Sequence, residues 1–187
     1  MLILKAAVRV IAKKGVRGLR VEELAAEAGV STALIYYHFG DRAGLLRRTL
    51  EYVSERADRY TAKAMEGSDD ARTQLTDMLL LELQDDPAVI ENSSAWGELR
   101  ASAIFDPDLR GQLGESTRKW VDDLTELIDQ ARSDGTANAE TDARASAERL
   151  TALVEGLSDR WLSGSTPLER ARDLVRQAVS LELDYKK

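Results

Sequence analysis

Two short helical segments joined by the tripeptide Gly-Val-Ser constrain the fold of this chain more than any other feature. Gly29 follows the segment 21–28, whose apolar residues recur at helical spacing, and glycine readily adopts the left-handed conformation that ends a helix. Ser31 offers a side-chain oxygen to the free N–H groups of a second helix, which extends to Phe39 before Gly40. Two short helices separated by so tight a turn predict a helix-turn-helix.

The second short helix has an apolar side and an open side. Ile35 and Phe39 are the residues that we expect to face a core. A helix of barely two turns whose remaining side chains point away from a core has the size that enters the DNA major groove. The side chains expected on this open side are Thr32, Ala33, Tyr36 and Tyr37.

The flanking segments complete a small helical domain. Residues 2–14 carry one apolar stripe and end in Lys13-Lys14 before Gly15, where positive charge complements the negative end of a helix. Asp41 has the residue type and the position to cap the helix that follows the second short helix. We therefore expect a three-helix domain in residues 1–45.

These segments together resemble the DNA-binding domain of the TetR/AcrR family of bacterial transcriptional regulators. The matching elements are Ala6-Ala7, Lys14-Gly15, Leu24-Ala25-Ala26-Glu27-Ala28-Gly29-Val30-Ser31, Ile35-Tyr36-Tyr37-His38-Phe39, Arg42 and Leu45-Leu46. So many matches at fixed spacing make the resemblance specific, and it covers about the first quarter of the chain. The remainder is compatible with the helical effector domain of the family and carries no signature of its own.

The resemblance implies a set of DNA-binding residues. They are Arg20, Ser31, Thr32, Ala33, Tyr36, Tyr37, His38 and Arg42. Within this set, base edges or thymine methyls are expected for Thr32, Ala33 and Tyr37, and phosphates for Arg20, Tyr36, His38 and Arg42. The residues alone leave His38 open between local packing at the helix end and DNA contact, and the resemblance favours a phosphate contact.

Three departures from the family pattern have physical consequences. Leu19-Arg20 replaces the usual Ser or Thr cap of the helix 21–28, so either the cap is missing or Arg20 faces a phosphate. Leu34 places an aliphatic side chain where a small residue is common, at the edge of the expected DNA-facing surface. No basic arm precedes residue 2, so no minor-groove contact from such an arm is expected.

The charge of the chain is divided unevenly. The formal net charge is −7, yet residues 1–50 hold nine Lys and Arg against four Asp and Glu, and residues 51–187 hold 17 against 29. A basic segment attracts phosphates, and an acidic remainder is repelled by the duplex and helps to orient the approach. The alternative is that helical surfaces are simply rich in charge, but the asymmetry agrees with the motif.

Composition excludes several classes of site. The absence of cysteine rules out disulfides, thiolate nucleophiles and cysteine metal sites, and the only histidine, His38, lies inside the second short helix. No catalytic triad, Glu-x-x-His metal pair or glycine-rich phosphate loop is present, so we expect neither an enzyme nor a cofactor. No apolar run approaches the length of a membrane span and no signal peptide opens the chain, which predicts a cytoplasmic protein.

The remaining sequence predicts helices nearly throughout. Asp41 begins a helix that extends to about Met65, and Ser68 or Asp69 is expected to cap the next. The three prolines follow Asp86, Asp106 and Thr166, each pair typical of a helix start. The fold class expected is therefore all-α, with the three-helix helix-turn-helix domain followed by a six-helix effector-binding and dimerisation domain in residues 46–187.

The last two expected helices, 142–163 and 168–183, carry apolar stripes that are candidates for a homodimer interface. The candidate residues are Leu150, Val154, Leu157, Trp161, Ala171, Leu174, Val175 and Ala178. The resemblance favours a four-helix bundle between two subunits, and a recognition helix this short needs a second copy on a neighbouring half-site. The alternative is that these stripes pack only within their own subunit.

The sequence indicates a ligand pocket much less clearly. The candidates are the large apolar and aromatic residues of the helices that enclose the effector in this family: Tyr60, Met78, Trp96, Leu99, Phe105, Trp120 and Leu124. Such residues can line an adaptable pocket, but each is more readily explained as core. Glu82 and Glu98 become polar anchors only if they are buried.

Together these observations predict a dimeric, ligand-responsive transcriptional regulator, most simply a repressor that a small-molecule effector releases from a palindromic operator. The alternative is an all-α small-molecule-binding or protein-interaction module that no longer reads DNA. Intact Tyr36, Tyr37 and Arg42 favour the first reading, and the missing basic arm favours the second.

Overall fold

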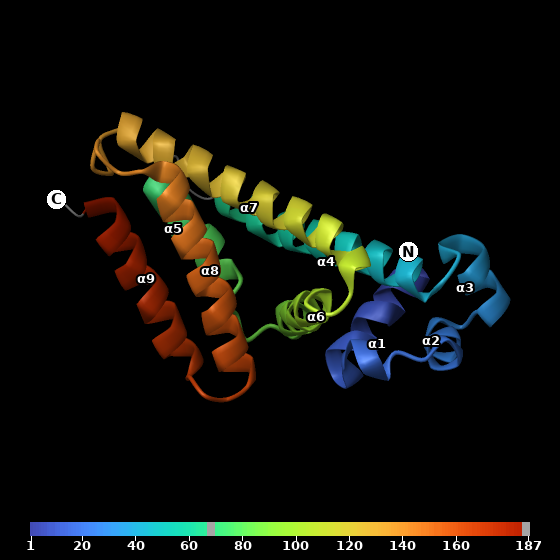
Figure 1. Cartoon of the computed structure of the whole chain (residues 1–187). Coiled ribbons are helices and arrows are strands. Elements are labelled where there is room, and N and C mark those ends of the chain that lie inside the picture. The colour runs from blue at the N-terminus through green and yellow to red at the C-terminus, as the bar shows by residue number, and fades with distance from the viewer. Residues whose placement is uncertain (67–69, 185–187) are drawn as a thin grey trace. The chain divides into compact units, whose positions relative to one another are not determined.

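The structure is a computed structural model that describes residues 1–66 and 70–184, with the side chains of residues 60, 61 and 63–66 left out. Within these ranges the chain forms nine helices and no strand, which confirms the all-α prediction (Figure 1). The helices are α1 (Leu2–Gly18), α2 (Val21–Ala28), α3 (Thr32–Phe39), α4 (Arg42–Glu66), α5 (Ala71–Leu81), α6 (Pro87–Ala103), α7 (Pro107–Ser133), α8 (Ala143–Leu162) and α9 (Leu168–Asp184). None of these described helices is both long and apolar enough to cross a membrane.

Short polar side chains begin several helices as the sequence predicts. The Asp41 carboxylate accepts a hydrogen bond from the N–H of Gly44 at 2.7 Å, at the start of α4. Asp86 caps α6 by accepting from Ala88 at 2.7 Å. The expected cap of α5 differs, because Ser68 and Asp69 lie outside the described residues and the capping carboxylate belongs to Asp70.

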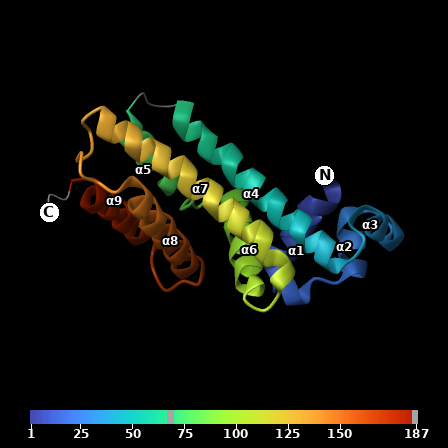
Figure 2. The same ribbon diagram turned by 45° about the horizontal axis from the view of Figure 1, so that its top comes forward.

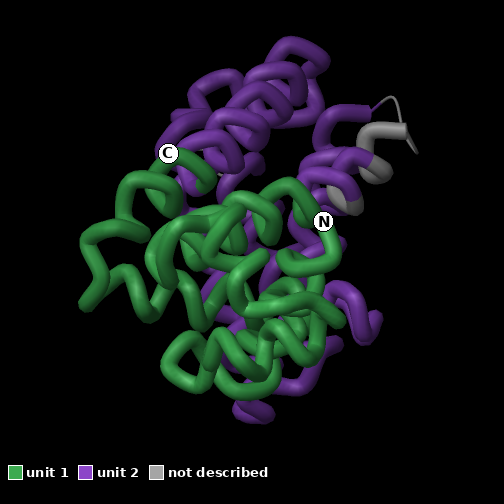
Figure 3. The backbone as a smooth tube through the Cα atoms, turned by 90° about the vertical axis from the view of Figure 1, so that its right-hand side faces the viewer, with its two compact units in different colours: residues 1–57, 90–116 green, residues 58–89, 117–187 purple. Residues whose placement is uncertain are grey.

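The chain folds into two compact units, which Figure 3 distinguishes by colour. Unit 1 comprises residues 1–57 and 90–116, so most of α6 and the start of α7 pack with the helix-turn-helix segment. Its core is formed by apolar side chains that are almost wholly buried, among them Ile11, Leu24, Ile35, Leu46 and Leu99. The three N-terminal helices therefore share one core with parts of α4, α6 and α7.

Unit 2 comprises residues 58–89 and 117–187. Helices α8 and α9 lie side by side in both views of the ribbon (Figures 1 and 2), and α5 also packs on α9. Polar links tie the unit together: Arg172 donates to the carbonyl of Leu83 at 2.7 Å, and Arg149 bonds Glu182 between α8 and α9. The core of this unit is thus separate from that of unit 1.

Candidate DNA-binding surface

The turn between α2 and α3 has the geometry that the sequence predicts. Gly29 adopts left-handed dihedrals of φ 67° and ψ 35°, and the N–H of Val30 donates to the carbonyl of Ala25 at 2.9 Å. The Ser31 hydroxyl oxygen then accepts from the N–H of Leu34 at 3.2 Å and caps α3. Since both interactions are local, the sequence fixes the angle between the two helices without help from distant residues.

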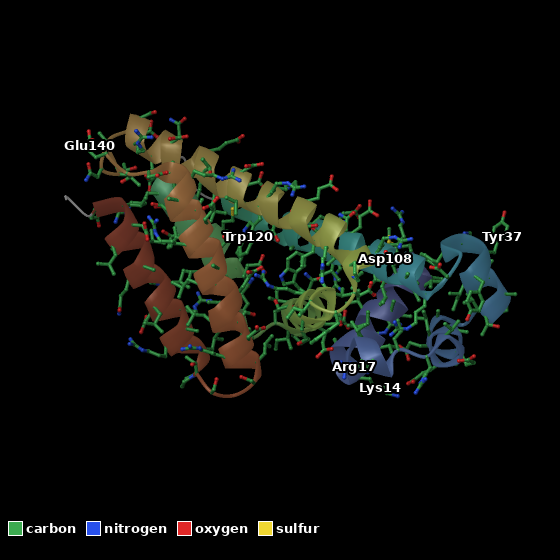
Figure 4. All side chains as sticks on the ribbon, viewed as in Figure 1. Lys14, Arg17, Tyr37, Asp108, Trp120 and Glu140 are labelled. Carbon is green, nitrogen blue, oxygen red and sulfur yellow. The ribbon has the colours of Figure 1, made fainter. Side chains whose placement is uncertain are left out.

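Helix α3 buries Ile35, half-buries Thr32 and Phe39, and exposes its other side chains. Ile35 is 1% exposed, whereas Tyr36 and Tyr37 are 49% and 82% exposed. Tyr37 projects outward from the helix (Figure 4), and its ring meets that of His38 edge-on with centroids 5.2 Å apart. A two-turn helix with this exposed aromatic face has the dimensions of a recognition helix, the helix that lies in the major groove.

The N-terminus of α2 has no side-chain cap, as one of the two sequence alternatives predicts. Arg20 occupies the capping position, and its side chain makes no capping hydrogen bond. Next to it lies a hollow of about 400 Å³ that opens on the surface of unit 1. The hollow is lined by Arg17, Leu19, Arg20, Val21, Glu22, Tyr36 and Arg42. The structure therefore brings three predicted phosphate contacts together from different segments and adds Arg17.

Ion pairs decide which cations of unit 1 remain available to an anion. Arg9 contacts Glu27 at 2.7 Å and Lys14 pairs with Glu23, so α1 is tied to α2 by two salt bridges. The hydrogen bond from Arg9 lowers the pKa of the Glu27 carboxyl. Among the described residues, neither Arg17 nor Arg20 has an ion pair or a side-chain hydrogen bond, and both are exposed. The hollow therefore holds two unpaired arginines, and unit 1 also has exposed lysines on α1 at positions 5 and 13.

Arg17 was missed by sequence reasoning, although one signal for it exists. It lies in the last turn of α1, just before the loop that leads to α2. A basic residue there is readily assigned to the helix end alone, as Lys13 and Lys14 were. Only the fold shows that Arg17 and Tyr36 line one hollow.

Arg42 has a structural contact in addition to its place in the hollow. Its Nη2 donates to the carbonyl oxygen of Val16 at 2.5 Å. The guanidinium has five N–H donors, so one bond to the backbone leaves others for a phosphate. Arg42 is exposed, and it joins the start of α4 to the α1–α2 junction.

The predicted ligand-binding residues are divided between the units. In unit 1, Leu99 is fully buried and Trp96 is half-buried; in unit 2, Met78 and Leu124 are buried and Trp120 is half-buried. Phe105 differs from the others, because its side chain is 77% exposed in the turn that follows α6. Tyr60 lies outside the described side chains.

One further polar atom accompanies these candidates. The indole Nε1 of Trp120 (labelled in Figure 4) is buried and has no hydrogen-bond partner among the described residues. A buried donor of this kind requires an explanation, such as a bound molecule or water.

The predicted dimer residues are largely on the inner side of α8 and α9. Five of them have 0–3% exposed surface in the single subunit: Leu150, Val154, Leu157, Ala171 and Val175. Such side chains have little surface left to bury against a second subunit, which favours the alternative that this part of the two stripes packs within its own subunit. Trp161, Leu174 and Ala178 are half-buried, and Leu181, which was not predicted, is 67% exposed.

We call the outward apolar residues the outer stripe. They are Leu153 and Trp161 on α8, and Leu174, Ala178 and Leu181 on α9. On α9 the three residues recur at i, i+4 and i+7, which places them on one face of the helix.

An exposed two-turn helix in a helix-turn-helix, beside a basic hollow, defines a DNA-binding protein. Comparison with known sequences agrees. The profile of the family described as "Bacterial regulatory proteins, tetR family" matches residues 3–49, and that of "BetI-type transcriptional repressor, C-terminal" matches residues 71–184. The chain belongs to the TetR family of bacterial transcriptional regulators, with a C-terminal domain of the BetI type.

Individual relatives span nearly the whole chain. The HTH-type transcriptional regulator BetI of Burkholderia cenocepacia is 26% identical, over 98% of this chain and 89% of its own length. A crystal structure of a protein from Rhodococcus sp., described as a TetR-family transcriptional regulator, is 46% identical with a TM-score of 0.90 and covers 97% of this chain and 96% of its own. A regulator from Saccharomonospora viridis in complex with choline shares the fold, with 24% identity, a TM-score of 0.87 and coverage of 97% and 95%.

These relationships confirm the class predicted from the sequence. The protein is a ligand-responsive, DNA-binding transcriptional regulator that acts on double-stranded DNA as a homodimer.

Proposed function

We propose that the protein is a repressor that binds a palindromic operator through residues 1–45 and dimerises and binds its effector through residues 46–187. The observation that carries this proposal is the pairing of the exposed face of α3 with a hollow that holds two unpaired arginines. Phosphate contacts from the hollow orient the duplex, and the face of α3 reads it. The protein acts in the cytoplasm, where the operator lies, and has no catalytic step.

Each predicted DNA-binding residue keeps its proposed role with one refinement. Thr32, Ala33 and Tyr37 contact base edges or thymine methyls, since they occupy the open side of α3. Phosphates are held by Arg17, Arg20, Tyr36, His38 and Arg42. Ser31 uses its oxygen as the cap of α3, so its O–H remains to donate to a phosphate.

Selection of bound duplexes from fragmented genomic DNA tests this proposal. The expected result is an enriched inverted repeat whose half-sites lie about 34–36 Å apart, or a multiple of that, centre to centre. Tyr37→Ala removes the exposed ring and should relax the sequence preference, whereas Tyr37→Phe keeps the ring and is the conservative control. If no inverted repeat is enriched while the protein still binds a small molecule, the protein is a ligand-binding module that does not read DNA.

We propose further that the effector is an apolar or amphipathic small molecule bound in the C-terminal domain. The half-buried Trp120 supports this proposal, because it combines a large apolar surface with an unpartnered indole donor. Choline, the ligand of the Saccharomonospora viridis regulator, is the first compound to test, together with longer amphiphiles.

Reciprocal titration is the decisive measurement for the effector. Compounds that raise the melting temperature are titrated again in the presence of saturating operator. A coupling of about 1–3 kcal/mol weakens the ligand 5- to 150-fold when operator is bound, and operator is weakened by the same factor. A ligand whose affinity does not change with operator is no effector.

A further inference from the structure

The backbone of one residue near the end of α1, Val16, is held from two sides. Gly15 interrupts α1 with non-helical dihedrals of φ 72° and ψ 169°. The N–H of the next residue, Val16, donates to Oε2 of Glu98 on α6 at 3.1 Å, and its carbonyl oxygen accepts from Arg42 on α4 at 2.5 Å. A single residue of the DNA-binding segment is therefore bonded to both α4 and α6, all within unit 1.

The approach of Glu98 depends on the glycine. A Cβ atom at Gly15 would lie 2.7 Å from Oε2 of Glu98, closer than carbon and oxygen approach without repulsion. The positive φ of Gly15 is also strained for any other residue. The kink in α1 thus has both the backbone conformation and the open space that a carboxylate from α6 requires.

Charge and dipole are arranged to favour the contact. The negative carboxylate faces the N–H end of residue Val16, and the positive guanidinium faces its carbonyl. Hydrogen bonds that involve an ionised group are stronger than neutral ones. Glu98 is an exposed residue, so burial does not force its carboxylate into this position, and it is no buried anchor for a ligand.

We propose that Glu98 is a positioning residue for operator binding: through Val16 it fixes the angle at which α1, α2 and α3 are held relative to α6. The proposal rests on the proposed function, since it matters only for a dimer that reads two half-sites. The apolar core of unit 1 already joins this segment to α4 and α6, and the bond from Glu98 adds a directional polar link that restricts its tilt on that core. The angle of α3 then sets the half-site spacing that the dimer accepts.

The spacing of the operator gives a direct test. The selected inverted repeat is shortened or lengthened at its centre by one or two base pairs, each of which rotates the half-sites by about 35° relative to each other. Dissociation constants are measured at one salt concentration for the wild type, Glu98→Ala and Glu98→Gln. Glu140→Ala, an exposed carboxylate of unit 2, is the charge-matched control (Figure 4).

We expect the wild type and the control to prefer one spacing by about tenfold or more, an effect of the size of one mismatched base pair. Glu98→Ala is expected to reduce this preference to about threefold or less, with an unchanged melting temperature, because a segment held by the apolar core alone tilts more readily and adapts to several spacings. Glu98→Gln keeps an oxygen acceptor for the Val16 N–H and should restore most of the preference. A general loss of stability would weaken all the duplexes alike and leave the ratios unchanged.

The outcomes separate this proposal from the proposed function. If Glu98→Ala keeps the wild-type spacing profile, or if the wild type accepts every spacing equally, the positioning role is wrong while DNA binding stands. If no inverted repeat binds the wild type, the proposed function itself fails. Should Glu98→Ala not fold, Glu98→Asp takes its place, because it withdraws the carboxylate by about one C–C bond, 1.5 Å, and keeps the charge.

Discussion

Two neighbouring residues of α9 lead to opposite predictions for the same substitution. Leu174 is half-buried and belongs to the outer stripe, whereas Val175 has no exposed surface and packs in the core of unit 2. Replacing either by Glu introduces one negative charge into the same turn of the same helix. Only the surroundings of the two side chains differ, so the pair isolates the effect of position.

The expected cost at Val175 is large. Full burial raises the pKa of a carboxyl group by several units; once it passes 7 the buried group takes up a proton, and the cost at pH 7 is then about 3.7 kcal/mol, from about 2.7 units of about 1.36 kcal/mol each. Loss of the buried valine adds about 1.5–3 kcal/mol. Since folded domains are stable by only about 5–15 kcal/mol, Val175→Glu should unfold the subunit or nearly so.

The expected cost at Leu174 appears only on association. In the single subunit the new carboxylate reaches water, so the fold should lose only the half-burial of the leucine, about 1 kcal/mol. If the outer stripes of two subunits pair, each subunit buries one such carboxylate in the interface, and each buried ion costs several kcal/mol. Leu174→Glu should therefore be a folded monomer. Its operator binding should be weaker, because a single helix-turn-helix domain reads only one half-site.

Light scattering after size exclusion, together with thermal unfolding followed by circular dichroism, distinguishes these outcomes. Ser180→Glu is the control, since it adds the same charge at an exposed position of α9 outside the outer stripe. A dimeric Leu174→Glu of wild-type affinity would refute the outer stripe as the interface. A well-folded, monomeric Val175→Glu would instead show that the inner side of α9 faces the partner.

Other predictions concern the remaining parts of the molecule. Tyr37→Ala should relax the sequence preference of operator selection, whereas Arg20→Ala should weaken all duplexes alike and reduce the salt slope by about one unit per subunit in binding titrations. Gly15→Ala should destabilise the protein by about 1–3 kcal/mol through its positive φ, and by less in a Glu98→Ala background, where the repulsion is gone; a double-mutant cycle by chemical unfolding measures this difference. The hydrogen bond from Arg149 lowers the pKa of Glu182 below 4.5, so its stabilisation is present above that pH and lost as the pH falls through the lowered pKa. Glu182→Gln should cost about 1 kcal/mol or less near pH 7, and this cost should shrink as the pH falls below 4.5 in thermal melts.

The N-terminal helices were predictable because their signals are local. Gly29, Ser31 and Asp41 each act on groups only a few residues away, and the structure shows each in the expected conformation or bond. The same reasoning predicted the helix starts at Pro87 and Pro107. Such short-range interactions are encoded by residue type and spacing alone.

The faces of α8 and α9 were not predictable in the same way. Helical periodicity shows which residues share a face, but α9 has two adjacent apolar faces, and the candidate list joined Ala171 and Val175 from one with Leu174 and Ala178 from the other. Which face meets α5 and which meets solvent depends on long-range packing. The same limit applies to Phe105, where an aromatic residue expected in a pocket lies on the surface.

The bond between Val16 and Glu98 shows the limit most clearly. The two residues are 82 positions apart, and Glu98 is one of many acidic residues on exposed helix surfaces. The sequence does reveal Gly15 as a helix boundary, but it does not reveal that the glycine also leaves room for a carboxylate. The contact between Gly15 and the Glu98 carboxylate on α6 is therefore visible only in the folded structure.

The ion pairs of residues 1–50 bear on how strongly DNA binding should depend on salt concentration. Residues 1–50 carry a formal excess of five positive charges, which for a dimer would suggest a salt slope of about −9 in a plot of log affinity against log salt concentration. Yet Arg9, Lys14 and Arg48 are paired with carboxylates, and Arg47 lies 3.7 Å from Asp108. Three arginines line the hollow, so a dimer neutralises about six phosphates and the slope should be near −5. A slope near −5 would show that the two hollows make the phosphate contacts and orient the duplex beside the recognition helix, whereas a slope near −9 would show that Lys5 and Lys13 on α1 reach the duplex as well.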